Sequence, residues 1–197
     1  MEGNYKLVLA YDGTDYHGFQ VQPDLPTVQG VLERALDRLA RRESPLYAAG
    51  RTDAGVHALG QVVSFRGVLR VPVGELARRL NQILPPDVLV VSAERVEDGF
   101  HARHSARARE YAYYLQVEEK PSPFAARFVY WCPFRLDLDG MREALSHVRG
   151  LHDFTPFSRL EVGRSRFREV LEAELCQWGK VVAIRVKANA FAWAMMR

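Results

Sequence analysis

Two kinds of hydrophobic spacing follow one another along the chain, and their order is the strongest constraint on its fold. In the first half, alternating or β-branched segments predict strands over residues 5–11, 44–49, 61–65 and 88–95. Apolar side chains at helical spacing predict helices over residues 27–41 and 73–84, with Thr27 as N-cap and Pro72 at the start of the second. The order is therefore strand, helix, two strands, helix and strand, which is typical of a ferredoxin-like unit.

The second half has a related order. Strands are expected over residues 109–118, 128–132, 166–177 and 181–187, and a helix over 137–148 that Gly150 closes. A helical pattern begins at Asn189. These patterns predict a mixed α/β (α+β) fold, in which two ferredoxin-like (RRM-like) halves share a mixed, largely antiparallel central sheet with helices packed on it. We place the halves at residues 1–98 and 99–197, and expect them to share one sheet because the linker over residues 97–99 is short.

The composition and the motifs of the chain argue against a membrane-spanning protein and against common metal or nucleotide sites. Hydrophobic residues make up 48% of the 197 residues and no apolar run is long enough to span a bilayer, so a cytoplasmic location is expected. The two cysteines, Cys132 and Cys176, lie far apart and are expected to be small buried side chains rather than metal ligands. Nucleotide-binding glycine motifs, HExxH and GxSxG are absent from the sequence. These absences favour a site without a metal or cofactor.

The stretch AAGRTDAGVHALGQVVSF, residues 48–65, contains the best candidate for a reactive group. Asp53 stands between Arg51 and His57 in a loop bracketed by Gly50 and Gly55. One interpretation is a tight turn, in which the aspartate bonds to nearby backbone amides. The other is an ionised carboxylate, held by the neighbouring guanidinium, that acts as a nucleophile or general base. The residues alone leave both open.

Positive charge is mild overall and clustered. The formal net charge is +3, and only four of the 27 basic residues are lysines. Arginine can bind phosphate through two hydrogen bonds and stack on bases, which fits contact with RNA, although genome composition or solvated strand faces would explain the same bias. The arginines that we assign to RNA contact are Arg103, Arg107, Arg109, Arg159, Arg164 and Arg166.

The segment GRTDAGVHA, residues 50–58, resembles the catalytic motif of the tRNA pseudouridine synthase A family. Other segments also resemble that family and follow the same order along the chain. They are YDGTDYHGFQVQP, TVQGVLERAL, NQILPPDV, FHARHSARAREYAYYL, GLHDFTPFS and ANAFAWAMMR. The resemblance runs from about residue 5 to residue 197 and implies the pseudouridine synthase fold. It implies an enzyme that isomerises uridine to pseudouridine in the anticodon stem-loop of tRNA, at tRNA positions 38, 39 or 40, without a metal or other cofactor.

The resemblance also assigns roles to individual positions. Asp53 is expected to be the catalytic carboxylate, and Arg51 to extrude the base or hold the tRNA. Tyr111 is expected to stack on the flipped uracil, and Arg197 to pair with the aspartate. His57 is expected to shape the loop. Phe154 and Phe157 are expected to pack in the core.

Two departures from the family pattern are visible. Ala192 replaces a leucine expected to pack under the base, and Trp193 or Met195 is expected to compensate. The chain stops at Arg197 where the family continues, so a truncated C-terminus is expected.

The resemblance further implies a homodimer that binds tRNA.

Two alternative functions are also compatible with the sequence. One is a pseudouridine synthase of the same superfamily that acts on another RNA. The other is a ferredoxin-like RNA-binding module without catalysis, although the aromatic motif of RRM modules is absent from the sequence.

Overall fold

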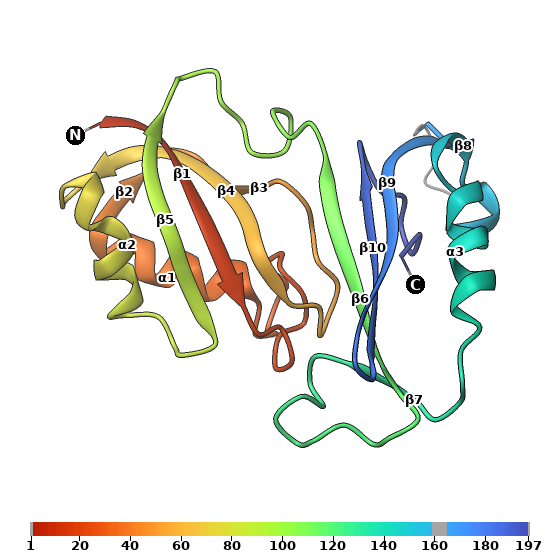
Figure 1. Cartoon of the computed structure of the whole chain (residues 1–197). Coiled ribbons are helices and arrows are strands. Elements are labelled where there is room, and N and C mark those ends of the chain that lie inside the picture. The colour runs from red at the N-terminus through yellow and green to blue at the C-terminus, as the bar shows by residue number, and fades with distance from the viewer. Residues whose placement is uncertain (1, 159–164, 197) are drawn as a thin grey trace. The chain divides into compact units, whose positions relative to one another are not determined.

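The computed structural model describes residues 2–158 and 165–196, and the chain divides into two compact units, Met1–Ala106 and Arg107–Arg197 (Figure 1). The elements of the first unit are β1 (Glu2–Tyr11), α1 (Val28–Leu39), β2 (Ala40–Arg42), β3 (Tyr47–Ala48), β4 (Ala58–Leu69), α2 (Val73–Asn81) and β5 (Val88–Val96). Those of the second are β6 (Arg109–Val117), β7 (Tyr130–Cys132), α3 (Leu138–His147), β8 (Gly150–Asp153), the 3₁₀ turn η1 (Thr155–Phe157), β9 (Phe167–Trp178) and β10 (Val181–Ala188).

The first unit has the strand order expected of a ferredoxin-like unit. Its sheet runs β2-β4-β1-β5, with β3 also paired to β4, and all of these pairings are antiparallel. Thr27 caps α1 as expected, since its side chain accepts a hydrogen bond from the Gly30 amide. Ala40 and Arg41 were expected to end the helix, but Ala40–Arg42 pair with β4 as a strand. Pairing with a neighbouring strand therefore outweighed the local helical pattern.

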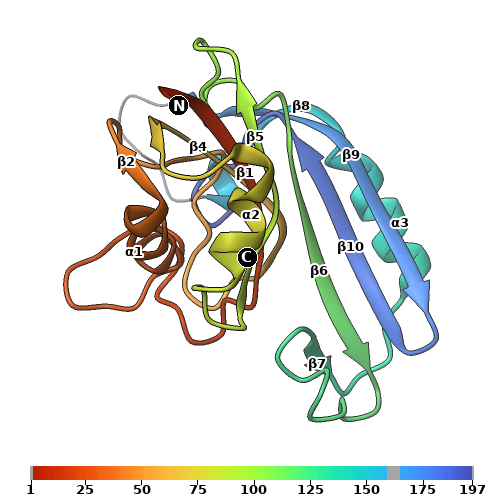
Figure 2. The same ribbon diagram turned by 90° about the vertical axis from the view of Figure 1, so that its left-hand side faces the viewer.

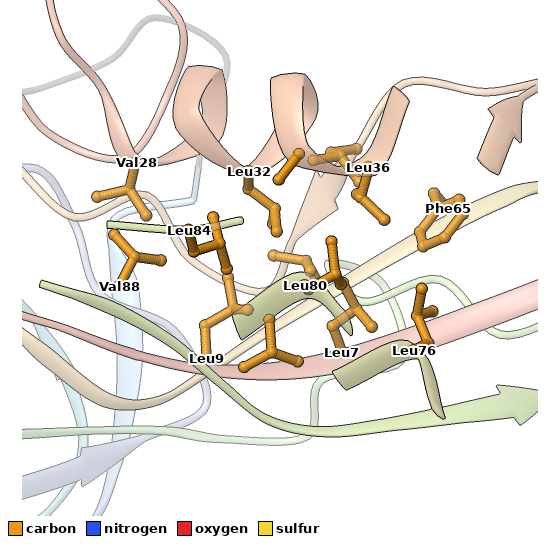
Figure 3. Close-up of a cluster of buried hydrophobic side chains, with 14 of the residues drawn as sticks. Leu7, Leu9, Val28, Leu32, Leu36, Phe65, Leu76, Leu80, Leu84 and Val88 are labelled. Carbon is orange, nitrogen blue, oxygen red and sulfur yellow. The ribbon is translucent and has the colours of Figure 1, made fainter. Parts of the chain in front are cut away.

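Alternation along β1 creates the core of this unit. Tyr5, Leu7, Leu9 and Tyr11 are all buried on one face of the sheet. The apolar stripe of α1 and that of α2 pack on the same face, so strand and helix side chains meet in one cluster (Figure 3). Figure 3 labels members of this cluster from both helices and both central strands: Leu7, Leu9, Val28, Leu32, Leu36, Phe65, Leu76 and Leu80.

Leu32 is expected to be a major contributor to the stability of this core. Its side chain is fully buried, so Leu32→Ala leaves a cavity and should lower the free energy of unfolding by about 2–5 kcal/mol. The matched control is Leu59→Ala, since Leu59 is 87% exposed and its loss should cost less than about 0.5 kcal/mol. Urea unfolding of the two variants measures the difference, and equal losses would contradict this account of the core.

Residues 97–106 belong to the first unit because polar side chains of its sheet hold their backbone. Asn4 donates through its Nδ2 atom to the carbonyl oxygens of Glu97 and Phe100, at 2.9 and 2.8 Å. The amide of Ala102 donates to Oγ of Ser64 at 3.0 Å. These contacts cover part of the sheet face opposite the helices, because Asn4 and Ser64 lie there and are both buried.

The second unit is built on a long hairpin. Its sheet runs β7-β6-β10-β9-β8, with β9 and β10 joined through the turn at Gly179, which has a φ of +57°. Helix α3 packs along β9, as Figures 1 and 2 both show. The hydrophobic core of the second unit contains Phe154, Val170, Ala173, Val186 and Ala188.

The mixed α+β class expected from the sequence is confirmed, with one correction to its detail. The described strands pair in two five-stranded sheets, one in each unit, instead of one shared sheet. The physical reason is that the segment after β5 is held as turns by the contacts with Asn4 and Ser64, so it does not extend the sheet of the first unit. Within the part of the chain that the structure describes, no helix is long and apolar enough to cross a membrane.

Three smaller expectations also need correction. Cys132 and Cys176 are only half-buried. The helix expected from Asn189 is a turn over residues 193–196. Strand β8 begins at Gly150, where the sequence indicated only the end of a helix, because residues 150–153 pair with β9.

Candidate active site

Asp53 lies in the loop that joins β3 to β4 in the first unit. Arg51 and Asp53 are exposed, whereas Thr52 between them is half-buried and turns inward. Its hydroxyl oxygen lies 2.8 Å from the hydroxyl of Tyr11 at the end of β1. Thr52 therefore anchors the loop to the core, and its two charged neighbours are exposed.

A second loop, residues 12–19, forms backbone hydrogen bonds with the loop that carries Asp53. The amide of Phe19 donates to the carbonyl oxygen of Thr52 at 3.0 Å, and the amide of Gly55 donates to that of Tyr16 at 3.2 Å. Phe19 and Tyr16 are both buried, so these bonds join the Asp53 loop to side chains of the core. Hydrogen bonds on either side of Asp53 thus fix the backbone that carries it.

Two glycines allow this close contact between the loops. A Cβ atom on Gly13 would lie 2.1 Å from the carbonyl oxygen of Val56, and one on Gly18 would lie 2.8 Å from that of Thr52. Gly18 also has a φ of +92°, which disfavours any residue with a side chain. No larger residue fits between the two loops at either position.

His57 belongs to the same contact. Its Nδ1 atom lies 3.1 Å from the amide nitrogen of Gly13 and 3.0 Å from Oδ1 of Asp12. A neutral Nδ1 accepts from Gly13, and a protonated one donates to Asp12, so either form joins the two loops. The geometry supports a role for His57 in shaping the loop.

Asp12 and Asp87 accept further hydrogen bonds from residues of the 12–19 loop. Asp12 accepts from the amide and the hydroxyl of Thr14, which closes the turn after β1. The hydroxyl of Tyr16 donates to Oδ1 of Asp87 at 2.9 Å. Burial and this carboxylate raise the pKa of the Tyr16 phenol above its ordinary value, so the phenol stays protonated and keeps donating.

The loop also forms a tight turn, as the first interpretation of Asp53 required. The amide of Val56 donates to the carbonyl oxygen of Asp53 at 3.2 Å. This bond uses the backbone of Asp53, and the residue as a whole is exposed. The turn is therefore compatible with a chemical role, because the backbone makes the turn and the residue itself is exposed.

The structure describes no group of three or more histidine, cysteine, aspartate or glutamate side chains that could hold a metal ion. That finding covers residues 2–158 and 165–196. The chemistry that the described loop itself offers is that of a single carboxylate on a rigid support: proton transfer, or attack on an electrophilic carbon.

In the second unit, the structure brings Tyr111 to the last motif of the sequence. Tyr111 lies on β6, and its ring meets that of Phe191 edge-on, with centroids 4.8 Å apart. Nη1 of Arg109, two residues earlier on the same strand, donates to the carbonyl oxygen of Asn189 at 3.0 Å. The segment ANAFAWAMMR is therefore attached to β6 at two points. Of the residues expected to compensate for Ala192, Met195 packs against the core of this unit, whereas Trp193 is 50% exposed.

The other sequence-predicted residues are distributed over both units. Arg103 lies in the first unit, and Arg107, Arg109, Tyr111 and Arg166 lie in the second. Arg103, Arg107 and Arg166 are exposed, as phosphate contacts require. Three predicted residues fall outside the described residues: Arg159, Arg164 and Arg197.

The two phenylalanines expected to pack in the core differ from one another. Phe154 is buried and belongs to the core of the second unit, as expected. Phe157 is 65% exposed, so that part of the expectation is wrong. The 3₁₀ turn Thr155–Phe157 carries Phe157 out of the core, while the ring of Phe154 stays inside.

Sequence reasoning missed the residues that support the Asp53 loop. Asp12, Gly13, Tyr16, Gly18 and Asp87 were given no individual role in the sequence analysis. The signal that could have revealed them is the alternation of glycines with aromatic residues in YDGTDYHGF. Glycines beside large apolar residues in a loop indicate that another segment of backbone approaches closely.

Fold and site together define a class of protein: a mixed α+β protein whose first unit presents one exposed carboxylate on a loop held by a second, glycine-containing loop. Comparison with known proteins identifies the family. The sequence matches the tRNA pseudouridine synthase family model over residues 7–105 and 144–197. The chain belongs to this family.

Curated relatives agree over nearly the whole chain. Proteins named tRNA pseudouridine synthase A from an Exiguobacterium species and from Oceanobacillus iheyensis are each 41% identical to it. The protein of that name from Bacillus subtilis is 39% identical over 98% of this chain and 79% of its own length. The alignments with the first two cover 98% of this chain and 78% and 77% of those proteins.

Proposed function

We propose that the protein isomerises uridine to pseudouridine in tRNA, with Asp53 as the catalytic carboxylate. The observation that supports this most directly is the position of Asp53 within GRTDAGVHA: it is exposed, and both ends of its loop are fixed by hydrogen bonds to residues 16 and 19. Family membership supports the reaction, and the described geometry supports the residue. The half that carries this loop is proposed to be residues 1–98.

The proposed reaction balances without an oxidant or reductant. The bond between C1′ and N1 of uridine breaks, a bond between C1′ and C5 forms, C5 loses a proton and N1 gains one. Substrate and product therefore contain the same atoms, and carboxylate chemistry with proton transfer is sufficient. The uracil must leave the base stack to reach Asp53, as bases do in other enzymes that act on them.

Other residues receive proposed roles in the same reaction. Arg51, exposed two residues before Asp53, is proposed to hold the tRNA or to help extrude the base. Tyr111 is proposed to stack on the flipped uracil, with Phe191 supporting its ring. Arg197 is proposed to pair with Asp53. Exposed Arg103, Arg107 and Arg166 are proposed to contact phosphates, together with Arg109, Arg159 and Arg164.

The substrate, assembly and location are proposed at a finer level. The target is uridine in the anticodon stem-loop, at tRNA positions 38, 39 or 40. The protein is proposed to act as a homodimer in the cytoplasm without a bound cofactor.

Product formation on tRNA transcripts tests the function. Transcripts that carry uridine at positions 38, 39 and 40 are incubated with the protein, and pseudouridine is mapped by carbodiimide treatment and primer extension. Pseudouridine at one or more of these positions is expected. Transcripts with cytidine at the same positions are the control. Tight tRNA binding without any pseudouridine would favour the RNA-binding module instead.

A further inference from the structure

Three aromatic rings meet on the surface of the first unit. The rings of Tyr47 and His101 have centroids 4.2 Å apart, and those of His101 and His104 are 4.4 Å apart. Tyr47 is 37% exposed, and His104 is also exposed. We call Tyr47, His101 and His104 the ring cluster.

The turn that carries the two histidines is fixed by its own hydrogen bonds. The amides of His104 and Ser105 both donate to the carbonyl oxygen of His101, at 3.0 and 2.8 Å. The amide of His101 donates to Oγ of Ser105 at 3.0 Å. Ala102, inside the turn, is buried and bonded to Ser64 of β4. The ring cluster is therefore held in place before any ligand arrives.

The anchoring of this turn does not depend on the rings. Buried Ala102, together with Asn4 and Ser64, fixes the segment to the sheet, whereas Tyr47 and His104 remain accessible. Tyr47 pairs with Ser64 across the sheet, which places it on the face opposite the helices. The burial of Ala102 and the hydrogen bonds of Asn4 and Ser64 therefore account for the position of the turn. They do not account for the exposed rings of Tyr47 and His104, which a role in ligand binding would explain.

A basic residue, Arg103, lies in the same turn as the two histidines. Burial lowers the pKa of His101, and the neighbouring His104 and Arg103 lower it further because their positive charges disfavour another one. Nδ1 of His101 accepts from the amide of Arg103 at 3.2 Å, so the Nε2 atom carries the proton of the neutral ring. The carboxylate of Asp98, in the same segment, pairs with Arg66 at 3.1 Å.

We propose that the ring cluster is an RNA-binding subsite, which stacks an unpaired nucleobase on its exposed rings and contacts the adjoining phosphate through the histidines. Exposed aromatic rings bind single-stranded RNA through the flat faces of its bases, and neighbouring cationic groups bind its backbone. This inference rests on the proposed function, because the RNA is taken to be the tRNA substrate. It adds a contact that the family motif around Asp53 does not contain.

Equilibrium binding of unmodified RNA tests the subsite independently of catalysis. Fluorescence anisotropy at one fixed salt concentration gives Kd for a tRNA transcript and the wild type, Tyr47→Leu and His104→Ala. Each substitution is expected to raise Kd about tenfold through the loss of a stacking surface. His147→Gln, at the exposed end of α3, is the matched control and should leave Kd within about twofold of the wild-type value. Urea unfolding of each variant shows whether it is folded.

A second comparison separates base stacking from a general effect of charge. The increase in Kd should be seen with an anticodon stem-loop and should be absent with a fully paired RNA duplex of the same length, because paired bases offer no free face. Folded Tyr47→Leu and His104→Ala proteins that bind the stem-loop as tightly as the wild type would overturn the proposal. So would equal weakening with the duplex.

The outcomes also separate this inference from the proposed function. If wild type forms pseudouridine and both ring variants bind tRNA normally, the subsite is wrong and the function stands. If both variants bind tRNA weakly but wild type forms no pseudouridine, the subsite stands and the catalytic function is wrong. If the wild type shows no affinity for tRNA, both are wrong.

Discussion

Asp53→Asn is expected to reduce pseudouridine formation by at least about 10²–10⁴-fold, the range associated with the loss of a positioned proton-transfer group. Asparagine has nearly the same shape, so the hydrogen bonds of the loop backbone to residues 16 and 19 should persist. The carboxylate charge is lost, and with it the ability to accept a proton or to attack carbon. Single-turnover assays with excess enzyme measure the rate, and anisotropy measures tRNA affinity, which should change by less than about twofold.

Asp24→Asn is the matched control for this experiment. Asp24 is an exposed carboxylate of the same unit, and its φ of +57° is one that asparagine adopts readily. Its replacement should leave both rate and affinity unchanged. Product formed at the wild-type rate by Asp53→Asn would remove this residue from the centre of the reaction, whatever its position in the motif.

Gly13→Ala is expected to displace the Asp53 loop without touching the carboxylate. The added methyl group would lie 2.1 Å from the carbonyl oxygen of Val56, so one of the two loops must move. The hydrogen bond from the Gly13 amide to His57 would then be strained or lost. The cost should be about 1–3 kcal/mol in the free energy of unfolding, as for other overpacked sites, together with at least about tenfold lower pseudouridine formation.

A second glycine provides the control for the added methyl group. Gly74 lies in α2, where a Cβ atom would meet no other atom within 4 Å. Gly74→Ala should therefore stabilise the protein by about 0.5–1 kcal/mol, because alanine loses less backbone entropy in a helix. If urea unfolding and activity of Gly13→Ala resemble those of Gly74→Ala, the proposed packing of the two loops is incorrect.

Much of the fold could be predicted because its signals are local. The alternation of Tyr5, Leu7 and Leu9 predicted a half-buried strand, and the spacing of Val28, Leu32 and Leu36 predicted the helix that packs on it. These patterns depend only on the periods of strand and helix, so they are visible without knowledge of contacts. Asp53 could be singled out because its motif is continuous in the sequence, and its expected role came from the resemblance of that motif to the family.

The errors share a different cause. Residues 40–42 and 150–153 became strands because partner strands lay beside them, and their own sequences do not specify those partners. Phe157 and Phe154 are three residues apart and chemically identical, yet only Phe154 is buried. Such differences depend on which surface each side chain meets after folding.

The sequence by itself determined most of the strands and helices, the family and the identity of the candidate carboxylate. Only the tertiary structure decided how that carboxylate is held. Support for the Asp53 loop comes from Tyr11, Tyr16 and Gly18, more than 30 residues away along the chain. The ring cluster likewise joins Tyr47 to His101 through strand pairing and a turn. Periodicity is a property of neighbouring residues, whereas these contacts form only when separate segments pack against each other.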